Sequence, residues 1–241
     1  MDAPTQQRLL ALNAAFYRQF GAAYAEKRGR VQPGVQRVLA RVPAGARVLD
    51  VGCGHGLALR ALTDAGFRGA YVGLEASPVL LDLARRHDLA PARAVWVRGD
   101  LTSRPWPAAV AGPFDVLLAF AVLHHLPGRA TRRAVLAALR ERAAGPAAWL
   151  AVSVWNFLRS PRLRARVQPW AAVGLSPAQV EPGDYLLDWR HRGAGLRYVH
   201  HYTPAELAAD LAATGWRVGE MFLADGEGGR LGLYAVATPQ S

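Results

Sequence analysis

Most of the chain alternates between short apolar runs and longer segments with helical spacing of apolar positions. The apolar runs have the length and β-branched content of buried strands, and they cover 47–52, 70–75, 94–100, 114–120 and 147–155. The segments between them repeat apolar residues every three or four positions, and they cover 57–66, 78–87 and 129–145. Strands that alternate with helices are typical of parallel strands joined by helical crossovers, so the pattern excludes an all-helical bundle.

The two ends of the chain extend this pattern. Residues 5–27 place apolar side chains at helical intervals, and a second short helix is predicted for 32–42, with Pro33 near its start. Near the C-terminus a helix is predicted for 204–215. The last two apolar runs flank a glycine-rich turn, as in a β-hairpin, and they cover 216–224 and 230–238.

Residues 156–203 interrupt this alternation of strands and helices. The apolar residues of this 48-residue segment show no steady period, and connections of this length often contain functional parts. We therefore expect an N-terminal helical segment, a core, an inserted substrate cap, and a C-terminal helix and hairpin that complete the core. These four parts cover 1–43, 44–155, 156–203 and 204–241.

Composition narrows the class of protein. The 241 residues, 51% of them hydrophobic, suffice for one large domain or for one domain with an inserted cap. No apolar run reaches the length of a membrane span, and the N-terminus lacks the layout of a signal peptide. The single Cys53 cannot form an internal disulfide. We therefore expect a cytoplasmic protein that does not act at a membrane.

The formal net charge of +11 allows two interpretations. A basic excess of this size can attract a polyanion such as tRNA. However, Lys27 is the only lysine and alanine is abundant, a pattern that a GC-rich coding bias would also produce. Charge alone does not decide between them.

The stretch VLDVGCGHG, residues 48–56, lies where the first core strand passes into a helix. Gly52, Gly54 and Gly56 let the backbone approach a ligand without interference from a Cβ atom. Ligands of such sheets bind at the carboxyl ends of the strands. The G-x-G-x-G spacing after Asp50 differs from the phosphate-binding G-x-G-x-x-G, and the Lys-Ser/Thr pair of a P-loop is missing.

Acidic residues end the next two strands. Glu75 closes 70–75, where its carboxylate can accept two hydrogen bonds from a ribose diol. Asp100 closes 94–100, where it could accept from an adenine amino group. Each acid alone is typical of a solvated loop, but their positions at successive strand ends predict one adenosyl ligand along this edge.

These motifs resemble those of the class I S-adenosylmethionine-dependent methyltransferases. The matching stretches are VLDVGCGHG, VGLEAS, RGDL and FDVLLAFAVLHHL, within about residues 44–155 and 204–238. The resemblance implies an α/β fold with a Rossmann-like, seven-stranded, mostly parallel sheet whose last strand is antiparallel. The hairpin predicted at the C-terminus suits that ending.

The resemblance also implies S-adenosylmethionine as the cofactor. The glycine turn would line its methionine part, and Asp50 would orient that turn or the amino group. Glu75 would bind the ribose, and Asp100 with Leu101 would meet the adenine. The backbone of Phe120 would face the methionine end.

Outside this core the chain resembles the tRNA wobble-uridine (carboxymethyluridine-34) methyltransferases, which esterify a carboxymethyl group. The similar stretches are FYRQFGAAYAEKRGRVQPG, AVLHHL, VSVWNF, GDYLLDW and RYVHHYTPAEL. The turn after Arg28, the LLDW of the insert and RYVHHY depart from that family's usual residues. The resemblance implies tRNA as a partner and, as in eukaryotic members, a small activating protein as a candidate partner.

A carboxylate acceptor suits the chemistry of this resemblance. Methyl transfer from a sulfonium is an in-line displacement, and a carboxylate is already ionised at pH 7, so no general base is required. We expect Arg28 to clamp that carboxylate with its guanidinium. His124 is the second catalytic candidate, and His125 is expected at the substrate, whereas a phenol, amine or alcohol acceptor would need a base.

The insert supplies the remaining candidate contacts to substrate. Its stretch WRHRGAGLRYVHHY mixes aromatic and cationic side chains that could stack on and hydrogen-bond an unpaired base. The residues concerned are Trp189, Arg197, Tyr198 and His200. An ordinary cap with Trp189 and Tyr198 in its own core is equally compatible. No Cys or acidic residue stands at metal-ligand spacing from the histidines, so no metal site is expected.

Our leading hypothesis is therefore a methyltransferase that acts on a tRNA wobble uridine or a close relative. A methyltransferase for a small-molecule substrate would use the same core with a different cap. A non-catalytic module that keeps the fold and binds a partner is the second alternative. The glycine turn, Glu75 and Asp100 argue against that module because they predict cofactor binding.

Overall fold

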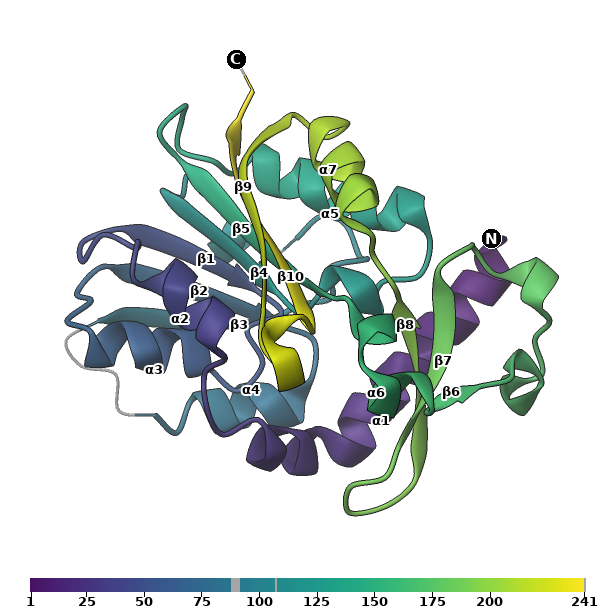
Figure 1. The fold of residues 1–241 in the computed structure, drawn as a ribbon. Coiled ribbons are helices and arrows are strands. Elements are labelled where there is room, and N and C mark those ends of the chain that lie inside the picture. The colour runs from purple at the N-terminus through teal and green to yellow at the C-terminus, as the bar shows by residue number, and fades with distance from the viewer. Residues whose placement is uncertain (88–91, 107, 241) are drawn as a thin grey trace.

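The computed structural model describes residues 1–87, 92–106 and 108–240, which fold around a twisted seven-stranded sheet (Figure 1). The strand order is β3-β2-β1-β4-β5-β10-β9. Neighbours from β3 to β5 are parallel, whereas β10 runs antiparallel to both β5 and β9. The strands are β1 (Arg47–Val51), β2 (Ala70–Glu75), β3 (Arg93–Arg98), β4 (Val116–Phe120), β5 (Trp149–Trp155), β9 (Trp216–Ala224) and β10 (Gly232–Pro239). The predicted sheet and the C-terminal hairpin are confirmed.

The central strands are buried on both faces, which explains their uninterrupted apolar sequence. Successive side chains of a strand point to opposite faces, so each central strand contributes to two cores. Leu49 and Leu117 pack with the helices of one face, and Val48 and Leu118 pack with those of the other. The edge strand β3 is only partly buried, in keeping with its mixed sequence.

Helices cover both faces of the sheet (Figure 1). Helices α2 (Pro33–Leu39) and α3 (Leu57–Asp64) contribute to one core, and α5 (Arg129–Arg140) and α7 (Pro204–Ala212) contribute to the other. Helix α4 (Pro78–Ala84) packs beside β3 and against α1 (Ala3–Lys27).

Local sequence sets the starts of several helices. Proline opens α2, α4 and α7, where its missing N–H would have no helical partner. The hydroxyls of Ser77 and Thr203 cap α4 and α7 by accepting from Leu80 N–H and Glu206 N–H.

The insert folds as a small antiparallel sheet with the order β6-β7-β8. Its elements are η3 (Phe157–Arg159), α6 (Pro161–Arg164), β6 (Val167–Gln168), η4 (Trp170–Val173), η5 (Pro177–Gln179), β7 (Asp184–Trp189) and β8 (Gly195–His200). The remaining 3₁₀ turns are η1 (Ala108–Val110), η2 (Leu123–His125) and η6 (Glu227–Gly229). The sequence did not predict these strands because the insert shows no steady period, although β7 and β8 are as long as the strands of the core.

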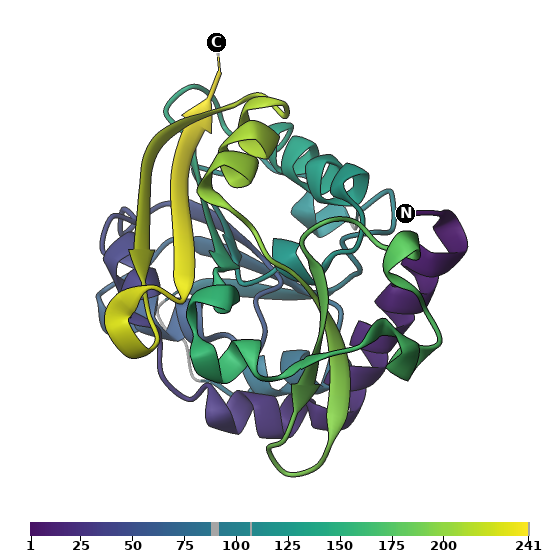
Figure 2. The ribbon, with the colours of Figure 1, turned by 45° about the vertical axis from the view of Figure 1, so that its right-hand side comes forward.

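Helix α1 lies along the β7–β8 hairpin rather than on the seven-stranded sheet (Figure 2). Phe16 and Phe20 of α1 pack around Trp189 of β7. The N-terminal segment and the insert therefore share one hydrophobic cluster, and together they form a cap beside the carboxyl ends of the central strands. None of the helices that the structure describes has the length and apolar character needed to cross a membrane.

Candidate active site

The three glycines of the turn after β1 all have positive φ, at 67°, 56° and 82° for Gly52, Gly54 and Gly56. Their surroundings differ. A Cβ atom at Gly52 would collide with the side chain of Val122, and one at Gly56 would lie 2.8 Å from the ring of Trp96. A Cβ atom at Gly54 would meet no heavy atom within 4 Å. Gly54 therefore faces open space where a ligand could approach the backbone, whereas packing alone already requires glycine at the other two positions.

Glu75 joins the end of β2 to this turn. Its carboxylate accepts hydrogen bonds from the backbone N–H of Gly54 at 3.0 Å and of Ser77 at 2.8 Å. Burial raises the pKa of Glu75, although these N–H donors act in the opposite direction. Each carboxylate oxygen keeps a further lone pair for an incoming hydroxyl. The side chain is thus fixed in place with acceptor capacity left over.

The other two strand-end acids have different surroundings. Asp50 is buried, and it accepts a hydrogen bond from the Tyr71 hydroxyl. Burial raises the pKa of Asp50 to about 7, and the Tyr71 hydrogen bond opposes that rise. Asp100 is exposed, and it accepts from the N–H and the hydroxyl of Thr102, both at 2.8 Å. The neighbouring Leu101 packs into the core.

A cavity of about 60 Å³ lies beyond the glycine turn, between the ends of β4 and β5, the end of α1 and the C-terminal hairpin. Phe120, the last residue of β4, lines it. Ala121 follows with a φ of 56°, which is strained for a residue other than glycine, and its N–H donates to the Ser153 hydroxyl at 3.0 Å. Strain of this kind is typical of functional sites.

Arg28 is the C-cap residue that follows α1, and it contributes its side chain to this cavity. Its guanidinium lies over the rings of Trp155, at 5.5 Å, and Tyr24, at 5.9 Å. No carboxylate of the described residues comes within 4.0 Å of it. Asp225 lines the same cavity, but it accepts hydrogen bonds from the Gly34 N–H and the Tyr234 hydroxyl. Arg28 therefore gives the cavity a positive charge without a paired anion.

Arg197 of β8 adds a second positive charge behind Trp155. It is only 4% exposed, and its guanidinium lies 4.6 Å from the Trp155 ring centre and 5.3 Å from that of Phe16. Within the described part of the chain, its Nε and Nη1 atoms have no hydrogen-bond partner. Burial lowers the pKa of Arg197, yet guanidinium stays charged in proteins. Two arginines thus surround Trp155, and both bias this region toward an anionic ligand.

Both histidines of the η2 turn are neutral. His125 Nδ1 donates to the Tyr198 carbonyl at 3.3 Å, so its Nε2 accepts from the Tyr17 hydroxyl at 3.0 Å. Burial and the charge of Arg197 lower the pKa of His125 to about 3. His124 is fully buried, and its Nδ1 accepts from the backbone N–H of Trp155. Its pKa lies well below the usual value, chiefly because of burial. This placement favours a positioning role for His124, and its catalytic role stays a prediction.

The other candidates from the insert lie inside the cap. Trp189 belongs to the cluster with Phe16 and Phe20. The Tyr198 hydroxyl donates to Asp184 at 2.6 Å, and the two ring nitrogens of His200 contact Asp184 at 2.7 Å and Glu206 at 2.8 Å. Burial lowers the pKa of His200, but its hydrogen bonds to these carboxylates outweigh that effect and leave it raised. The structure does not bring these three side chains to the cavity, so substrate contact by them stays a prediction.

Sequence reasoning missed several residues that line the cavity. They are Ala121, Ser153, Asp225 and Tyr234. Ser153 pairs with Tyr234 across β5 and β10, which are separated by more than 75 residues of chain. Only the positive φ of Ala121 distinguishes it, and no sequence pattern reports that angle.

Comparison with known proteins assigns this geometry to a family. Residues 24–220 match a family model described as "Methyltransferase domain". The chain belongs to this family of S-adenosylmethionine-dependent methyltransferases. The predicted enzyme class and cofactor are confirmed, and the non-catalytic module is set aside.

Two curated relatives of this methyltransferase have names that indicate small-molecule substrates. A ubiquinone biosynthesis O-methyltransferase of Thiobacillus denitrificans is 31% identical over 68% of this chain and 62% of its own length. A trans-aconitate 2-methyltransferase of Azoarcus is 32% identical over 62% of this chain and 55% of its own length. The methyltransferase therefore spans less than two thirds of these relatives. The narrower resemblance to tRNA wobble-uridine enzymes gains no support from them.

Solved structures share the fold at low sequence identity. Magnesium protoporphyrin IX methyltransferase of Synechocystis, with bound S-adenosylhomocysteine, has a TM-score of 0.67 at 18% identity and covers 96% of this chain and 99% of its own. A putative methyltransferase in complex with the Haloferax volcanii Trm112 activator has a TM-score of 0.66 at 17% identity and covers 95% and 97%. An activating partner for the present methyltransferase stays a prediction.

The residues of the glycine turn fit the cofactor. The open space at Gly54 is one that a Cβ atom would enter, and the spare acceptor capacity of Glu75 suits a ribose diol. Among the residues described, no group of three or more His, Cys, Asp or Glu could hold a metal ion. Gly54 and Glu75 are therefore the residues that we expect to contact S-adenosylmethionine most directly.

Replacing Glu75 by glutamine should weaken S-adenosylmethionine binding by ~1.5–3 kcal/mol, the range for hydrogen bonds to a charged group. The amide keeps the shape of the carboxylate, but its NH₂ group would replace one of the two oxygens that accept from a backbone N–H in the natural chain. Two donors would then face each other, and one of these hydrogen bonds would be lost. Calorimetric titration would measure the change. Asp82→Asn, the same change at an exposed site on α4, is the control and should bind normally. An unchanged dissociation constant for Glu75→Gln would assign the ribose to another group.

Proposed function

We propose that the protein methylates a carboxylate of a small molecule and forms a methyl ester. The supporting observation is the guanidinium of Arg28, which lines the cavity at the ends of β4 and β5 and has no carboxylate partner among the described residues. A planar guanidinium matches a carboxylate in two-point hydrogen bonding. The buried charge of Arg197 on Trp155 adds to the same preference for an anion.

The protonation states of the nearby histidines support this acceptor over a phenol. A phenol or catechol acceptor has to lose a proton during methyl transfer, and a base with a pKa near 7 is best suited to take it. His125, at a pKa of about 3, is a weak base, and its Nε2 already accepts from Tyr17. A carboxylate needs no such base, because it is ionised at neutral pH. Of the two kinds of relative, the one named for trans-aconitate has the acceptor type that fits better.

The chain's own residues then have simple roles. When bound, S-adenosylmethionine supplies the methyl group on a sulfonium. Arg28 would hold one face of the acceptor carboxylate and orient a free oxygen lone pair. Phe120 and Trp155 would shield the reacting atoms from water, which strengthens the charge pairing. Because the product ester is neutral, its attraction to Arg28 is weaker than that of the acid, which favours release.

Transfer of labelled methyl groups to a panel of acceptors tests this proposal. We expect labelling of small di- and tricarboxylic acids such as trans-aconitate, with release of labelled methanol after alkaline hydrolysis. Neither the acceptor carboxylate nor His125 should add a titration step to the turnover between about pH 6 and about pH 9, so a step in that range would report Asp50, whose pKa is about 7. Catechols and total tRNA serve as the competing acceptors. Alkali-stable label on a catechol, or label on tRNA alone, would contradict the proposal.

A further inference from the structure

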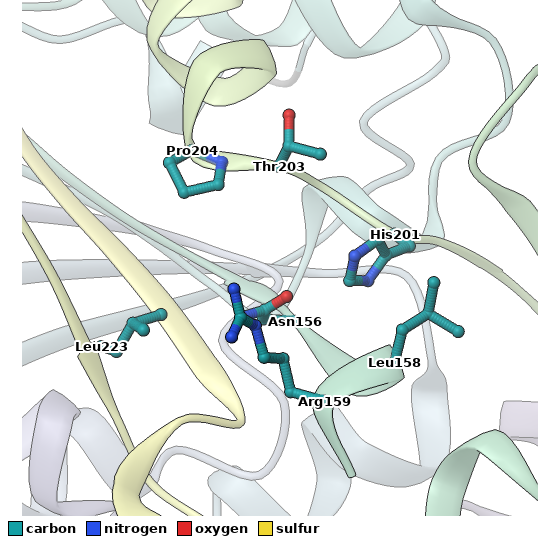
Figure 3. Close-up of a pocket in the computed structure, with 7 residues that line it drawn as sticks. All are labelled: Asn156, Leu158, Arg159, His201, Thr203, Pro204 and Leu223. Carbon is teal, nitrogen blue, oxygen red and sulfur yellow. The ribbon is translucent and has the colours of Figure 1, made fainter. Parts of the chain in front are cut away.

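A second cavity, of about 240 Å³, lies at the base of the cap. Asn156 and Arg159 line it where the chain leaves β5 to enter the cap, and His201, Thr203 and Pro204 line it where the chain returns to the core (Figure 3). Leu223 of β9 forms the opposite wall. Neither Arg28 nor any other residue that lines the smaller cavity contributes to this one.

Two polar side chains that line this cavity, Asn156 and His201, present atoms without a hydrogen-bond partner among the described residues. Asn156 is only 6% exposed, and its carboxamide makes no hydrogen bond to any described residue. The Nδ1 atom of His201 is also buried without a partner in the described structure. Burial lowers the pKa of His201, helped by the charge of His200, so the ring is neutral and one nitrogen can donate. Because an unsatisfied buried imidazole nitrogen is costly, the Nδ1 atom of His201 indicates a polar ligand, and the free carboxamide of Asn156 adds a donor beside it.

Arg159 gives the cavity its charge. Its side chain is exposed, and no carboxylate among the described residues lies within 4.0 Å of its guanidinium. The charge of Glu206 acts on His201, but this carboxylate is already bonded to His200 and paired with Arg132. The cavity therefore combines a cation with two neutral donors, a set that matches an oxyanion.

The wall formed by Leu223 is apolar and partly open. Leu223 is 39% exposed, and in the described part of the chain only Val95 among the large hydrophobic residues is more exposed. A ligand with a short hydrocarbon part would cover it. Inorganic anions would leave it in water.

We propose that this cavity binds a small organic oxyanion, with its anionic head at Arg159 and Asn156 and its apolar part on Leu223. This site is independent of the proposed function at Arg28. Because the lining residues come from both ends of the insert and from β9, a bound ligand would join the base of the cap to the C-terminal hairpin. It would thereby stabilise the cap in the position described here.

Titration of the full chain with butyrate, inorganic phosphate and neutral butyramide tests the proposal. The readouts are calorimetry and the side-chain amide NMR signal of Asn156, so no enzymatic activity is needed. We expect saturable binding of butyrate, weaker binding of phosphate and none of butyramide. Arg159→Gln should weaken butyrate binding about tenfold or more, as expected for a lost hydrogen bond to a charged group. Asn156→Asp keeps the size of the side chain but introduces a negative charge that repels the anion, so this variant should also bind butyrate more weakly.

Two control variants make the outcome specific. Arg162→Gln removes a neighbouring exposed arginine of α6 and should bind butyrate normally. Arg28→Ala removes the cation of the other cavity, so the butyrate response of the Asn156 amide signal, which reports only the second cavity, should stay unchanged. Equal loss in Arg159→Gln and Arg162→Gln would show only general attraction to a basic surface and would overturn the proposal. Absence of saturable binding, or butyramide binding as tightly as butyrate, would also overturn it.

Discussion

Replacing Gly54 by valine is expected to abolish S-adenosylmethionine binding while the protein stays folded. No heavy atom lies within 4 Å of the position that a Cβ atom would take, so the isopropyl group would occupy the space assigned to the cofactor. The φ of 56° is unfavourable for a side chain with a Cβ atom, at a cost of about 1–2 kcal/mol. That cost alone would reduce stability without removing the fold. Calorimetry would measure binding, and thermal unfolding would measure stability.

Gly66 offers a matched control for the backbone strain. It follows α3 with a φ of 88°, and a Cβ atom there would also meet no heavy atom within 4 Å. Gly66→Val should lose similar stability but bind the cofactor as the natural chain does. If Gly54→Val bound S-adenosylmethionine normally, the cofactor would not approach the turn at this glycine. If both variants lost binding equally, general destabilisation would explain the result.

Replacing Arg28 by alanine is expected to lower kcat/KM for the acceptor roughly 100-fold, equivalent to ~3 kcal/mol for loss of a two-point hydrogen bond to a carboxylate. The carboxylate loses its charge as the methyl group arrives, so its pairing with Arg28 is strongest in the bound acid. Most of the loss should therefore appear in KM for the acceptor rather than in kcat. The affinity for S-adenosylmethionine should be nearly unchanged, since Gly54 and Glu75 are assigned to that ligand.

Two further variants separate the roles of charge and shape. Arg28→Lys keeps the positive charge but not the planar fork, so its activity should lie between those of the natural chain and Arg28→Ala. Arg30→Ala removes an exposed arginine two residues away and should have little effect. Full activity in Arg28→Ala would remove the carboxylate clamp. It would also make Arg28 one more surface arginine in an arginine-rich chain.

The alternation of apolar runs and helical segments was sufficient to predict the parallel core. Its central strands are buried on both faces, so their sequence is continuously apolar and is recognised without knowledge of the partners. The glycine turn and Glu75 were predictable for a related reason. The carboxyl ends of parallel strands lie at one edge, so residues that end successive strands come together whatever the rest of the chain does.

The insert was different, because its strands are buried only by distant segments: α1 on the one hand, and Trp155 and Phe157 on the other. Phe16 and Phe20 cover Trp189 from a segment about 170 residues earlier in the chain, and a period within the insert does not report that partner. The buried, unpaired charge of Arg197 on Trp155 likewise depends on where β8 lies relative to β5.

The sequence by itself therefore determined the sheet, because periodicity is a local property, and its resemblance to known methyltransferases indicated the class of enzyme. The cofactor contacts along the strand ends stay a prediction. Tertiary structure alone decided that Gly52 and Gly56 meet Val122 and Trp96 whereas Gly54 meets open space. It alone decided that His125 is a hydrogen-bonded, neutral ring beside Arg197 rather than a base. Both results depend on distances and burial among segments remote in sequence, and these quantities set the space for a ligand and the free energy of a proton.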